Sequence, residues 1–329
     1  MTWNCLDDID ACLDAAFRQR VSGRPLEVVV VDNASTDGTA EHLATRGDEA
    51  ILLLRAENPG FAAGVNAGAG AATGDRLLLL NPDCVMDEGC VAALVDHLDA
   101  TPDCGAAAAL LRYPDGRQQA FARRELTLRD ALWSSTEMGR RWDGRFNRGH
   151  RLRQRWYHDT FARPLVVPTR VDTAAAACVL VRRADVRGPS GAVMDEELPL
   201  YFNDTDMYRR LRARGLHADI VPAATAVHAY GGTTRSVPDA RLKAETVRSQ
   251  LRYLGGSLPA WQLLVLRVAL VVDALGCAAL ALVRRRAAPW ALARGTWGGL
   301  GLPGGARPWL SSARPRRRSR RPAPPMPPT

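Results

Sequence analysis

The chain has 329 residues, 47% of them hydrophobic and 24% charged, so it can bury a large core in one large α/β domain or two smaller ones. Its formal net charge of +9 is regional, with arginines gathered in 123–155, 284–286 and 314–321. No nucleic-acid recognition motif or aromatic stacking platform accompanies these arginines, which argues against a nucleic-acid partner. They indicate contact with anionic lipid headgroups or diphosphates instead.

The cysteines form no CxxC pair and no zinc-ligand spacing, and their number is odd. They are therefore expected to be buried thiols in a reducing compartment rather than disulfides or zinc ligands. The N-terminal residues are acidic and lack an apolar core, so we expect no secretory signal peptide. The cysteines are Cys5, Cys12, Cys84, Cys90, Cys104, Cys178 and Cys277.

Apolar runs and turn residues alternate regularly in the first quarter of the chain. In chain order they predict a helix over 5–19, a strand over 28–31, a helix opening near Ser35 or Thr36, a strand over 51–54, a glycine-rich loop over 58–68 that enters a helix, and a strand over 77–80. This alternation predicts an α/β fold with a doubly wound, mainly parallel sheet. Gly68–Gly74 looks like a dinucleotide fingerprint, but it precedes a strand instead of following one, so an oxidoreductase is rejected.

The pattern changes after about residue 100. A hairpin is expected over 111–124, around Pro114-Asp115-Gly116, and 171–183 predicts a buried strand. The Arg- and Trp-rich stretch 125–163 has no assignment. The apolar run 198–202 is strand-like, and a helix is expected to begin near Met207.

Helices are expected after residue 240, including an apolar helix over 261–283 that is long enough to span a bilayer. Arg267 and Asp273 interrupt it and cannot pair on one helix face, which favours an interfacial or partly inserted helix. An ordinary helix that faces a core is the alternative. The Pro- and Arg-rich end over 311–329 is expected to be disordered.

Acidic residues follow two of the predicted strands. Asp32 ends the strand over 28–31 and Asp83 follows the strand over 77–80, and the carboxyl ends of parallel strands are where such sheets carry function. A third acidic segment, 194–211, contains Asp195, Glu196, Glu197, Asp204 and Asp206. Carboxylates grouped in this way suit a site where one takes a proton and its neighbours hold it in place. Together these segments indicate an enzyme that binds a nucleotide and a metal ion.

Four motifs follow one another along the chain. They are DNASTDGT (32–39), NPGFAAGVNAG (58–68) with LLLLNPD (77–83), the Pro-Asp-Gly hairpin with Arg-Arg (123–124), and DEELPLYFNDTD (195–206) followed by VHAYGG (227–232). In this order they resemble the inverting glycosyltransferases of the family 2 type, and especially bacterial rhamnosyltransferases that act on polyprenyl-diphosphate-linked acceptors. The resemblance covers about residues 2–255 and implies a GT-A-type sheet with C-terminal membrane-associated helices.

The resemblance also implies how the chain is divided. We expect a nucleotide-sugar-binding half over 1–100, an acceptor-binding and catalytic half of the same GT-A domain over 101–240, a helical, membrane-associated region over 241–310 and a disordered tail over 311–329.

By this resemblance, Asp32 accepts a hydrogen bond from the imide N–H of the donor base, although a helix N-cap acceptor would look the same. The family's Asp-x-Asp metal motif is Asn81-Pro82-Asp83 here, so Asp83 becomes the main ligand of Mg²⁺ or Mn²⁺ and Asn81 a weaker contact. Alone, this tripeptide would be a turn. His228 resembles a further metal ligand, although a lone histidine is more often structural. The residues implied to bind the donor are Thr2, Asn4, Asp32, Asn33, Gly60, Gly64, Asn66, Asn81 and Asp83.

An inverting transfer needs a base opposite the leaving diphosphate, and the resemblance assigns Asp204 to deprotonate the acceptor hydroxyl in a single displacement. Asn203, beside it, stands where many relatives carry Glu. Asp206 fits a helix N-cap as well as an acceptor contact, and Arg209 a solvated helix arginine. The residues implied to bind the acceptor are Asp195, Glu196, Asp206 and Arg209.

Relatives begin with a strand of about five or six apolar residues that runs into Thr-Trp/Tyr-Asn, which corresponds to Thr2-Trp3-Asn4 here. That first strand is therefore expected to be missing from this sequence, which would leave backbone groups of its neighbours unpaired. The alternatives are a start codon upstream of Met1 and an impaired product.

The expected protein is a glycosyltransferase of cell-envelope polysaccharide synthesis, held on anionic lipid at the cytoplasmic face of the bacterial membrane. It moves a sugar, L-rhamnose from dTDP-rhamnose, onto a polyprenyl-diphosphate-linked saccharide or a polysaccharide. Galactofuranose or a hexose is the alternative sugar. Two alternatives come from other classes: a catalytically inactive scaffold, and a nucleotidyltransferase, whose basic phosphate loop the sequence does not show.

Overall fold

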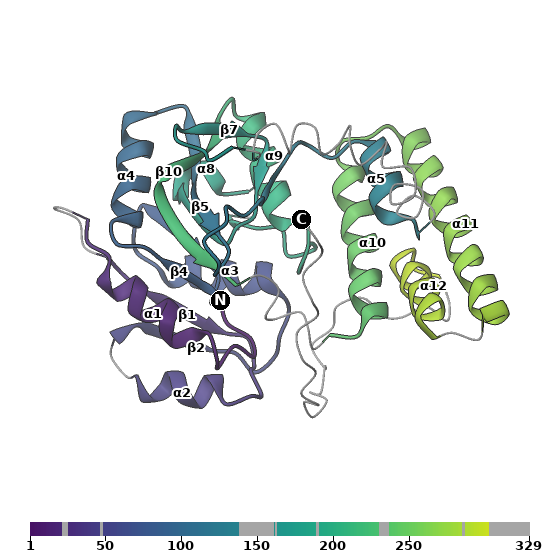
Figure 1. Ribbon diagram of the computed structural model, residues 1–329, viewed down its shortest axis with the longest axis horizontal. Helices are drawn as coiled ribbons and strands as arrows, with labels where there is room; N and C mark the ends of the chain where they lie inside the picture. The colour runs from purple at the N-terminus through teal and green to yellow at the C-terminus, as the bar shows by residue number, and fades with distance from the viewer. Residues whose placement is uncertain are drawn as a thin grey trace.

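A computed structural model of the chain describes residues 1–21, 26–46, 49–137, 161, 163–188, 191–229, 237–284 and 287–302. Figure 1 shows an α/β part and, beside it, a group of helices from the C-terminal region. Much of the arginine-rich stretch 123–155, the arginines at 285–286 and the tail predicted to be disordered lie outside the described residues.

The N-terminal elements follow the order that the sequence predicts. They are α1 (Ile9–Arg18), β1 (Val29–Asp32), α2 (Thr39–Thr45), β2 (Ile51–Leu54), α3 (Phe61–Ala71) and β3 (Arg76–Leu80). β1 and β2 pair in parallel, with Val29 opposite Ile51 and Asp32 opposite Leu54. The expected cap of α2 is wrong, because the helix begins only at Thr39, whose N–H donates to Oδ1 of Asp37 at 3.1 Å.

The main sheet is mixed. Its strands lie in the order β3, β9 (Cys178–Arg182), β5 (Cys104–Arg112), β10 (His217–His228) and β4 (Cys84–Met86), with β7 (Thr169–Val171) also paired to β10. β3, β5 and β10 run in one direction, and β9 runs against them between β3 and β5. The doubly wound α/β class is confirmed, with β9, β4 and β7 as the antiparallel members.

The core lies on both faces of β5. Every residue from Cys104 to Leu111 is buried, which is typical of a central strand covered by helices on both sides. One cover is α4 (Cys90–Ala100), which contributes Leu94 and Leu98 to the core cluster, and α9 (Asn203–Ala213) contributes Met207 and Leu211. This packing holds the ends of the central strands in fixed positions.

Three sequence predictions in the second half are corrected. The run 198–202 forms bends rather than a strand, and α9 begins at Asn203 instead of near Met207, directly after Phe202 with its left-handed φ of 65°. The single strand over 171–183 is divided into the end of β7, β8 (Thr173–Ala174), β9 and the start of α8 (Arg183–Val186).

The hairpin around Pro114-Asp115-Gly116 is confirmed. Gly116 N–H donates to the Tyr113 carbonyl at 2.9 Å, and Arg112 bridges to Gln118 across the turn. Beyond it, β6 (Ala122–Arg123) pairs antiparallel with β8. This returning chain brings Gln119 and Arg123 toward the carboxyl end of the sheet, where β5 and β10 end.

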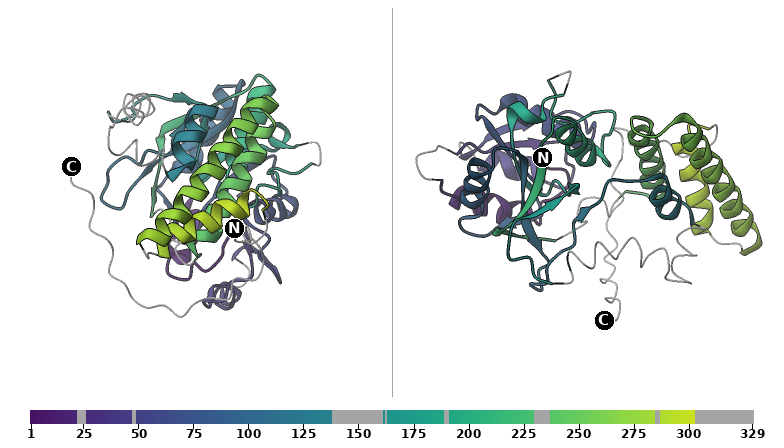
Figure 2. Two further views of the ribbon diagram at one scale, coloured as in Figure 1. Left: turned by 90° about the vertical axis from the view of Figure 1, so that its right-hand side faces the viewer. Right: turned by 90° about the horizontal axis from the view of Figure 1, so that it is seen from above.

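The C-terminal helices and one helix from the middle of the chain form a second cluster beside the sheet (Figures 1 and 2). They are α5 (Leu128–Ser135), α10 (Asp239–Gly255), α11 (Ala260–Arg284) and α12 (Ala287–Gly299). Their shared core includes Ala131, Val247, Leu254 and Leu270. α10 and α12 approach closely, since a Cβ at Gly295 would lie 2.6 Å from the Ala240 carbonyl oxygen.

One helix among the described residues is long and apolar enough to cross a membrane, Ala260–Val283 within α11. Its inner stripe, which includes Leu266, Leu270 and Ala274, is buried. Its outer side keeps large apolar side chains at 43–63% exposure: Trp261, Leu264, Val265, Val268, Val272 and Leu275. We call this set the outer face of α11.

Candidate active site

The end of β1 is held by a dense set of hydrogen bonds around Asp32. Its carboxylate is 1% exposed and accepts from the Thr2 hydroxyl at 3.1 Å and from the Ser35 N–H at 2.9 Å. Asn4 extends the same network, because its Oδ1 accepts from the Thr36 N–H at 2.8 Å. Thr2, Asn4 and Asp32 are thus brought together, as the sequence predicts for one half of the donor site.

The glycine-rich loop lies against this strand end. Asn33 donates through Nδ2 to the Gly60 carbonyl at 2.9 Å, while its buried Oδ1 has no hydrogen-bond partner among the described residues. Gly60 has φ of +113°, and a Cβ there would lie 2.6 Å from Pro199. A Cβ at Gly64 would lie 3.1 Å from Nδ2 of Asn33. Glycine is required at both positions because the chain passes its neighbours so closely.

Asn66 connects α3 to the acidic segment. Its Oδ1 accepts from the backbone N–H groups of Val193 and Met194 at 3.0 and 2.9 Å, and its Nδ2 donates to Glu196 at 3.0 Å. In this arrangement Asn66 and Glu196 hold the segment in place. Every polar atom of the Asn66 side chain is occupied by protein partners.

The expected metal ligands come together at the edge of the sheet. His228, at the end of β10, pairs with Cys84 of β4, which places Nε2 of His228 3.3 Å from Oδ1 of Asp83. Nδ1 of His228 lies 2.8 Å from Oε1 of Gln119, so the ring is fixed from both sides. β10 is long, His217–His228, and a bulge between Val221 and Thr225 accommodates Pro222.

These residues fit a divalent cation. Asp83 and His228 offer a carboxylate and an imidazole, and the buried Oδ1 of Asn81 is an acceptor with no hydrogen-bond partner among the described residues. A partner that keeps Nδ1 protonated directs Nε2 toward a metal, which is the arrangement found around metal-binding histidines. Oxygen ligands suit Mg²⁺, and Mn²⁺ also accepts imidazole.

Asp204 lies in the first turn of α9. Burial raises the pKa of its carboxyl group, against the hydrogen bonds from Thr205 and the positive charge of Arg123, which lower it. Its carboxylate accepts from the Thr205 N–H at 2.7 Å, and the Ala176 N–H also points to it. The next residue, Ala177, accepts from the Asn81 N–H at 2.8 Å, so one dipeptide contacts both Asp204 and Asn81.

Asp206 and Arg209 form a structural connection between α9 and α10. The buried Asp206 carboxylate accepts from Arg209 at 2.5 Å and from Arg210 at 2.9 Å. Arg209 also donates to the Tyr253 carbonyl at 2.8 Å and lies over the Tyr253 ring at 4.5 Å. Asp206 and Arg209 are thus both bound to other protein groups in this structure.

Asp195 also points to α10. Its Oδ2 lies 3.1 Å from Nη2 of Arg252, and its Oδ1 accepts from the Glu197 N–H at 3.0 Å. Asp195 and Glu196 are therefore neighbours in the chain with different partners, one on α10 and the other on α3.

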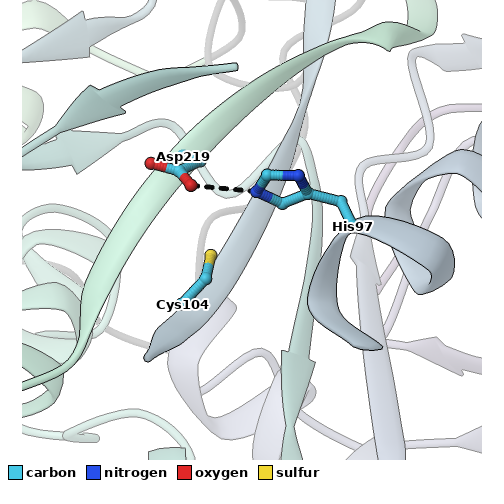
Figure 3. Close-up of side chains that lie close together, drawn as sticks. All are labelled: His97, Cys104 and Asp219. Carbon is cyan, nitrogen blue, oxygen red and sulfur yellow. Dashed lines mark hydrogen bonds and ion pairs between the residues drawn. The ribbon is translucent and has the colours of Figure 1, made fainter. Parts of the chain in front are cut away.

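A second group of possible metal ligands lies at the opposite end of the same strands. His97, Cys104 and Asp219 face one another at the amino ends of β5 and β10 (Figure 3), roughly 30 Å of strand away from His228. Asp219 accepts from His97 and His217 at 2.9 and 3.2 Å, and burial raises the pKa of the Cys104 thiol to about 12. The protonated thiol and satisfied carboxylate indicate a structural cluster.

Sequence reasoning missed Gln119, Arg123 and Arg252. Gln119 and Arg123 stand in the returning chain after the hairpin, and no local pattern marks a residue whose partner is a distant strand end. The Arg-Arg pair at 123–124 was the one available signal, because it belongs to the motifs that carry the resemblance, although no contact with Asp204 was assigned to it.

The sequence model of the family described as Glycosyl transferase family 2 matches residues 1–187, which is more than half of the chain. The chain is a family 2 glycosyltransferase. It is therefore an enzyme of the transferase class, and its α/β sheet is that of a GT-A fold.

Two curated relatives indicate where in the family it stands. The chain is 29% identical over 235 residues to an N-acetylglucosaminyl-diphospho-decaprenol L-rhamnosyltransferase of Mycobacterium tuberculosis, over 67% of this glycosyltransferase and 72% of the relative. It is 35% identical over 85 residues to glycosyltransferase AglE of Haloferax volcanii, over 25% and 28% of the two chains.

Solved structures show a weaker likeness. A mannosyltransferase from Pyrobaculum calidifontis, in complex with GDP-Man and Mn²⁺, aligns with a TM-score of 0.49 and 19% identity over 91% of this glycosyltransferase and 85% of that chain. S. aureus TarS 1-349 in complex with UDP-GlcNAc aligns with a TM-score of 0.47 and 13% identity, over 90% of this glycosyltransferase and 89% of that chain.

Proposed function

We propose that this family 2 glycosyltransferase transfers L-rhamnose from dTDP-L-rhamnose to a saccharide linked to a polyprenyl diphosphate, with inversion at the anomeric carbon. The observation that carries the proposal is the contact of His228 with Asp83, together with the dipeptide Ala176-Ala177 that links Asp204 to Asn81, two residues before Asp83. The name of the mycobacterial relative supports the choice of sugar and acceptor.

Asp204 is the proposed base. As the acceptor oxygen bonds to the anomeric carbon, the bond to the nucleoside diphosphate breaks and the hydroxyl proton passes to the Asp204 carboxylate. A raised pKa suits this role, because a carboxylate in a partly desolvated site accepts a proton more readily than one in water. Arg123 places a positive charge near the carboxylate, which lowers the pKa of Asp204 and offsets part of the effect of burial.

Asp83 and His228 are the proposed ligands of Mg²⁺ or Mn²⁺, with Asn81 as a further oxygen donor. When bound, such an ion neutralises the charge that develops on the departing diphosphate. Gln119 orients His228 through Nδ1, so that its other nitrogen faces Asp83. The side chains of Asp83 and His228 are already in place before the donor binds, which lowers the entropic cost of forming the metal site.

The nucleoside is proposed to bind along Asp32, with Thr2, Asn4 and Asn33 beside it. Asp32 accepts from the base imide N–H, and Oδ1 of Asn33, which has no partner in the described part of the chain, offers one more acceptor beside it. Gly60 and Gly64 allow the loop to approach this end of the sheet, and Asn66 fixes the acidic segment next to it.

The acceptor is proposed to lie between the acidic segment and α10. Asp195 and Glu196 line one side, and Asp206 with Arg209 form the other. Contacts with α10 and α3 hold Asp195, Glu196 and Arg209 in place.

The outer face of α11 is the proposed membrane contact, at the cytoplasmic face of the cell membrane. Its apolar side chains gather on the exposed side of the helix, while the opposite stripe contributes to the core. Such a face suits a helix that lies in the headgroup region with its core side toward the protein. The acceptor's lipid anchor then lies in the same membrane.

The experiment is a transfer assay with dTDP-, UDP- and GDP-sugars and a short-chain polyprenyl-diphosphate-linked N-acetylglucosamine. We expect a metal-dependent product with dTDP-L-rhamnose, with inverted anomeric configuration by NMR, and none with Asp204→Asn. Product with a UDP-sugar alone would replace rhamnose by a hexose or galactofuranose. A folded protein with no product and no nucleoside diphosphate release would support an inactive scaffold.

A further inference from the structure

The structural cluster at the amino ends of β5 and β10 brings three kinds of metal-binding atom together (Figure 3). His97 comes from α4, Cys104 begins β5 and Asp219 lies near the start of β10. A ring nitrogen, the thiol sulfur and a carboxylate oxygen of these residues all lie within 4.8 Å of one another. We call these three residues the amino-end cluster. Three separate elements thus direct a nitrogen, a sulfur and an oxygen to one point.

The charge of Asp219 is buried without an arginine or lysine partner in the described part of the chain. Hydrogen bonds satisfy its carboxylate, because Oδ2 lies 2.9 Å from Nε2 of His97 and 3.2 Å from Nε2 of His217. A histidine compensates the charge only when it is protonated. Since a buried carboxylate without a compensating charge is costly, the amino-end cluster favours a cation.

His217 holds the Asp219 carboxylate from outside the cluster. Nη2 of Arg170 lies 2.8 Å from Nδ1 of His217, while Oδ2 of Asp103 is farther from the same nitrogen, at 3.4 Å. A guanidinium group only donates, so Nδ1 accepts from Arg170 and the ring proton stands on Nε2, which faces Asp219. His217 is therefore neutral, and it supports the carboxylate as an outer partner supports a carboxylate that binds a metal.

The Cys104 thiol is protonated when no cation is bound. It donates to the Ala106 carbonyl at 3.2 Å, and burial raises its pKa to about 12. A metal ion that binds the sulfur replaces this proton, which passes to solvent. Arg182 donates to the Cys104 carbonyl at 2.6 Å, and its positive charge near the sulfur favours the thiolate.

We propose that His97, Cys104 and Asp219 bind a structural Zn²⁺ ion that joins α4 to the amino ends of β5 and β10, with water as the fourth ligand. Sulfur, imidazole and carboxylate ligands together suit Zn²⁺, whereas Mg²⁺ prefers oxygen alone. Zinc bonds of about 2.0–2.3 Å separate tetrahedral ligand atoms by roughly 3.3–3.6 Å, so atoms within 4.8 Å need to approach by only about 1 Å. The His97 side chain is 13% exposed, which gives water access to the fourth position.

The site is independent of the proposed sugar transfer, because it lies at the opposite end of the strands from His228. The expectation that the cysteines are not zinc ligands depended on short local spacings, and these ligands stand far apart in the chain. They meet only when α4 packs on the sheet and β10 pairs with β5.

The test uses Co²⁺ as a spectroscopic probe that Zn²⁺ then displaces. A thiolate bound to Co²⁺ gives an intense charge-transfer band in the near ultraviolet, which distinguishes this site from the proposed catalytic cation site, where no sulfur ligand is proposed. The proteins are the full-length parent, Cys104→Ser, Asp219→Asn and the matched control Cys277→Ser, which changes a buried cysteine of α11. Each is reduced and freed of metal with a chelator before titration.

We expect the band in the parent and in Cys277→Ser, its removal by Zn²⁺, and a rise in melting temperature with Zn²⁺, because the ion binds the native state. Cys104→Ser should show no band, and Asp219→Asn should bind Co²⁺ more than about 100-fold more weakly, beyond the 10–100-fold typical of losing an outer partner. A folded parent without the band, or a band that persists in Cys104→Ser, would overturn the proposal. The parent titration decides even if a variant does not fold, and no readout depends on sugar transfer.

Discussion

Nε2 of His228 lies 3.3 Å from Oδ1 of Asp83, although one residue ends β10 and the other precedes β4. Antiparallel pairing of the two strands places His228 opposite Cys84, so the backbone ladder sets the separation of the side chains. A pair fixed in this way can bind a cation with little rearrangement. Four predictions follow from this pair and its surroundings, and a fifth concerns α11.

Asp83→Ala is expected to weaken Mn²⁺-dependent binding of nucleoside diphosphate by more than about 100-fold, beyond the 10–100-fold typical of losing an outer partner of a metal site. The physical reason is the loss of the only carboxylate of the pair. Calorimetry with and without a chelator measures the effect. Asp96→Asn, an exposed carboxylate on α4, is the control and should bind like the parent. Parental affinity in Asp83→Ala would remove it from the metal site.

Gln119→Leu is expected to reduce Mn²⁺ affinity by about 10–100-fold while the fold is retained. Leucine keeps the size of the side chain but frees the His228 ring, because the contact at Nδ1 is lost. Paramagnetic resonance of Mn²⁺ titrations gives the affinity without any transfer assay. Gln118→Leu is the neighbouring control, and a similar loss in both variants would indicate a general disturbance of the hairpin.

Asp204→Asn is expected to lower kcat by about 10²–10⁴-fold with the donor affinity nearly unchanged, because the base acts in the transition state. Single-turnover transfer and donor titration separate the two quantities. In the parent, the acidic limb of the kcat–pH profile should lie above the range of an exposed aspartate, since burial raises the pKa of Asp204. A variant with parental turnover would exclude Asp204 as the base.

The same carboxyl group makes a prediction about stability. A carboxyl whose pKa is raised by folding stabilises the native state when it is protonated, at pH below its unfolded value, and this contribution is lost as the pH rises through the folded pKa. Asp204→Asn should therefore melt at a higher temperature than the parent at neutral pH, with the difference vanishing at low pH. A constant difference across that range would contradict the raised pKa.

Replacing Leu264, Val268, Val272 and Leu275 together by Ser is expected to weaken binding to anionic vesicles by more than about tenfold, since each buried apolar side chain contributes on the order of 1.5–3 kcal/mol. Vesicle flotation measures the change. Leu54→Ser, an exposed apolar residue on β2, is the control. Unchanged flotation of the fourfold variant would place the membrane contact elsewhere.

Several strands could be predicted closely because apolar runs are bounded by turn residues. β2 covers 51–54 as expected, and β3 begins one position before the expected 77. The start of α9 could not be predicted, since it depends on Phe202 taking a left-handed conformation while Pro199 packs on Gly60. These are tertiary contacts, and the aromatic run alone resembles a strand.

In the candidate site, the sequence marks the acidic residues but not the residues that support them. Asp32 and Asp83 follow recognisable strands, and Asp204 stands in a recognisable acidic segment. Gln119 gains its role only when the hairpin folds back on β10, and Arg123 only when β6 pairs with β8. The predicted acceptor residue Arg209 illustrates the opposite limit, because the sequence shows its charge but not its bonds to Asp206 and Tyr253.

The connection from α9 to α10 has a geometric consequence. Arg209 ties Tyr253 to the helix that carries Asp204, and α10 packs in the same cluster as α11. For a bilayer bound at the outer face of α11, these rigid contacts fix the height of Asp204 above the lipid surface. Under the proposed function, the membrane-anchored acceptor reaches Asp204 only when its free hydroxyl lies at that height above the lipid.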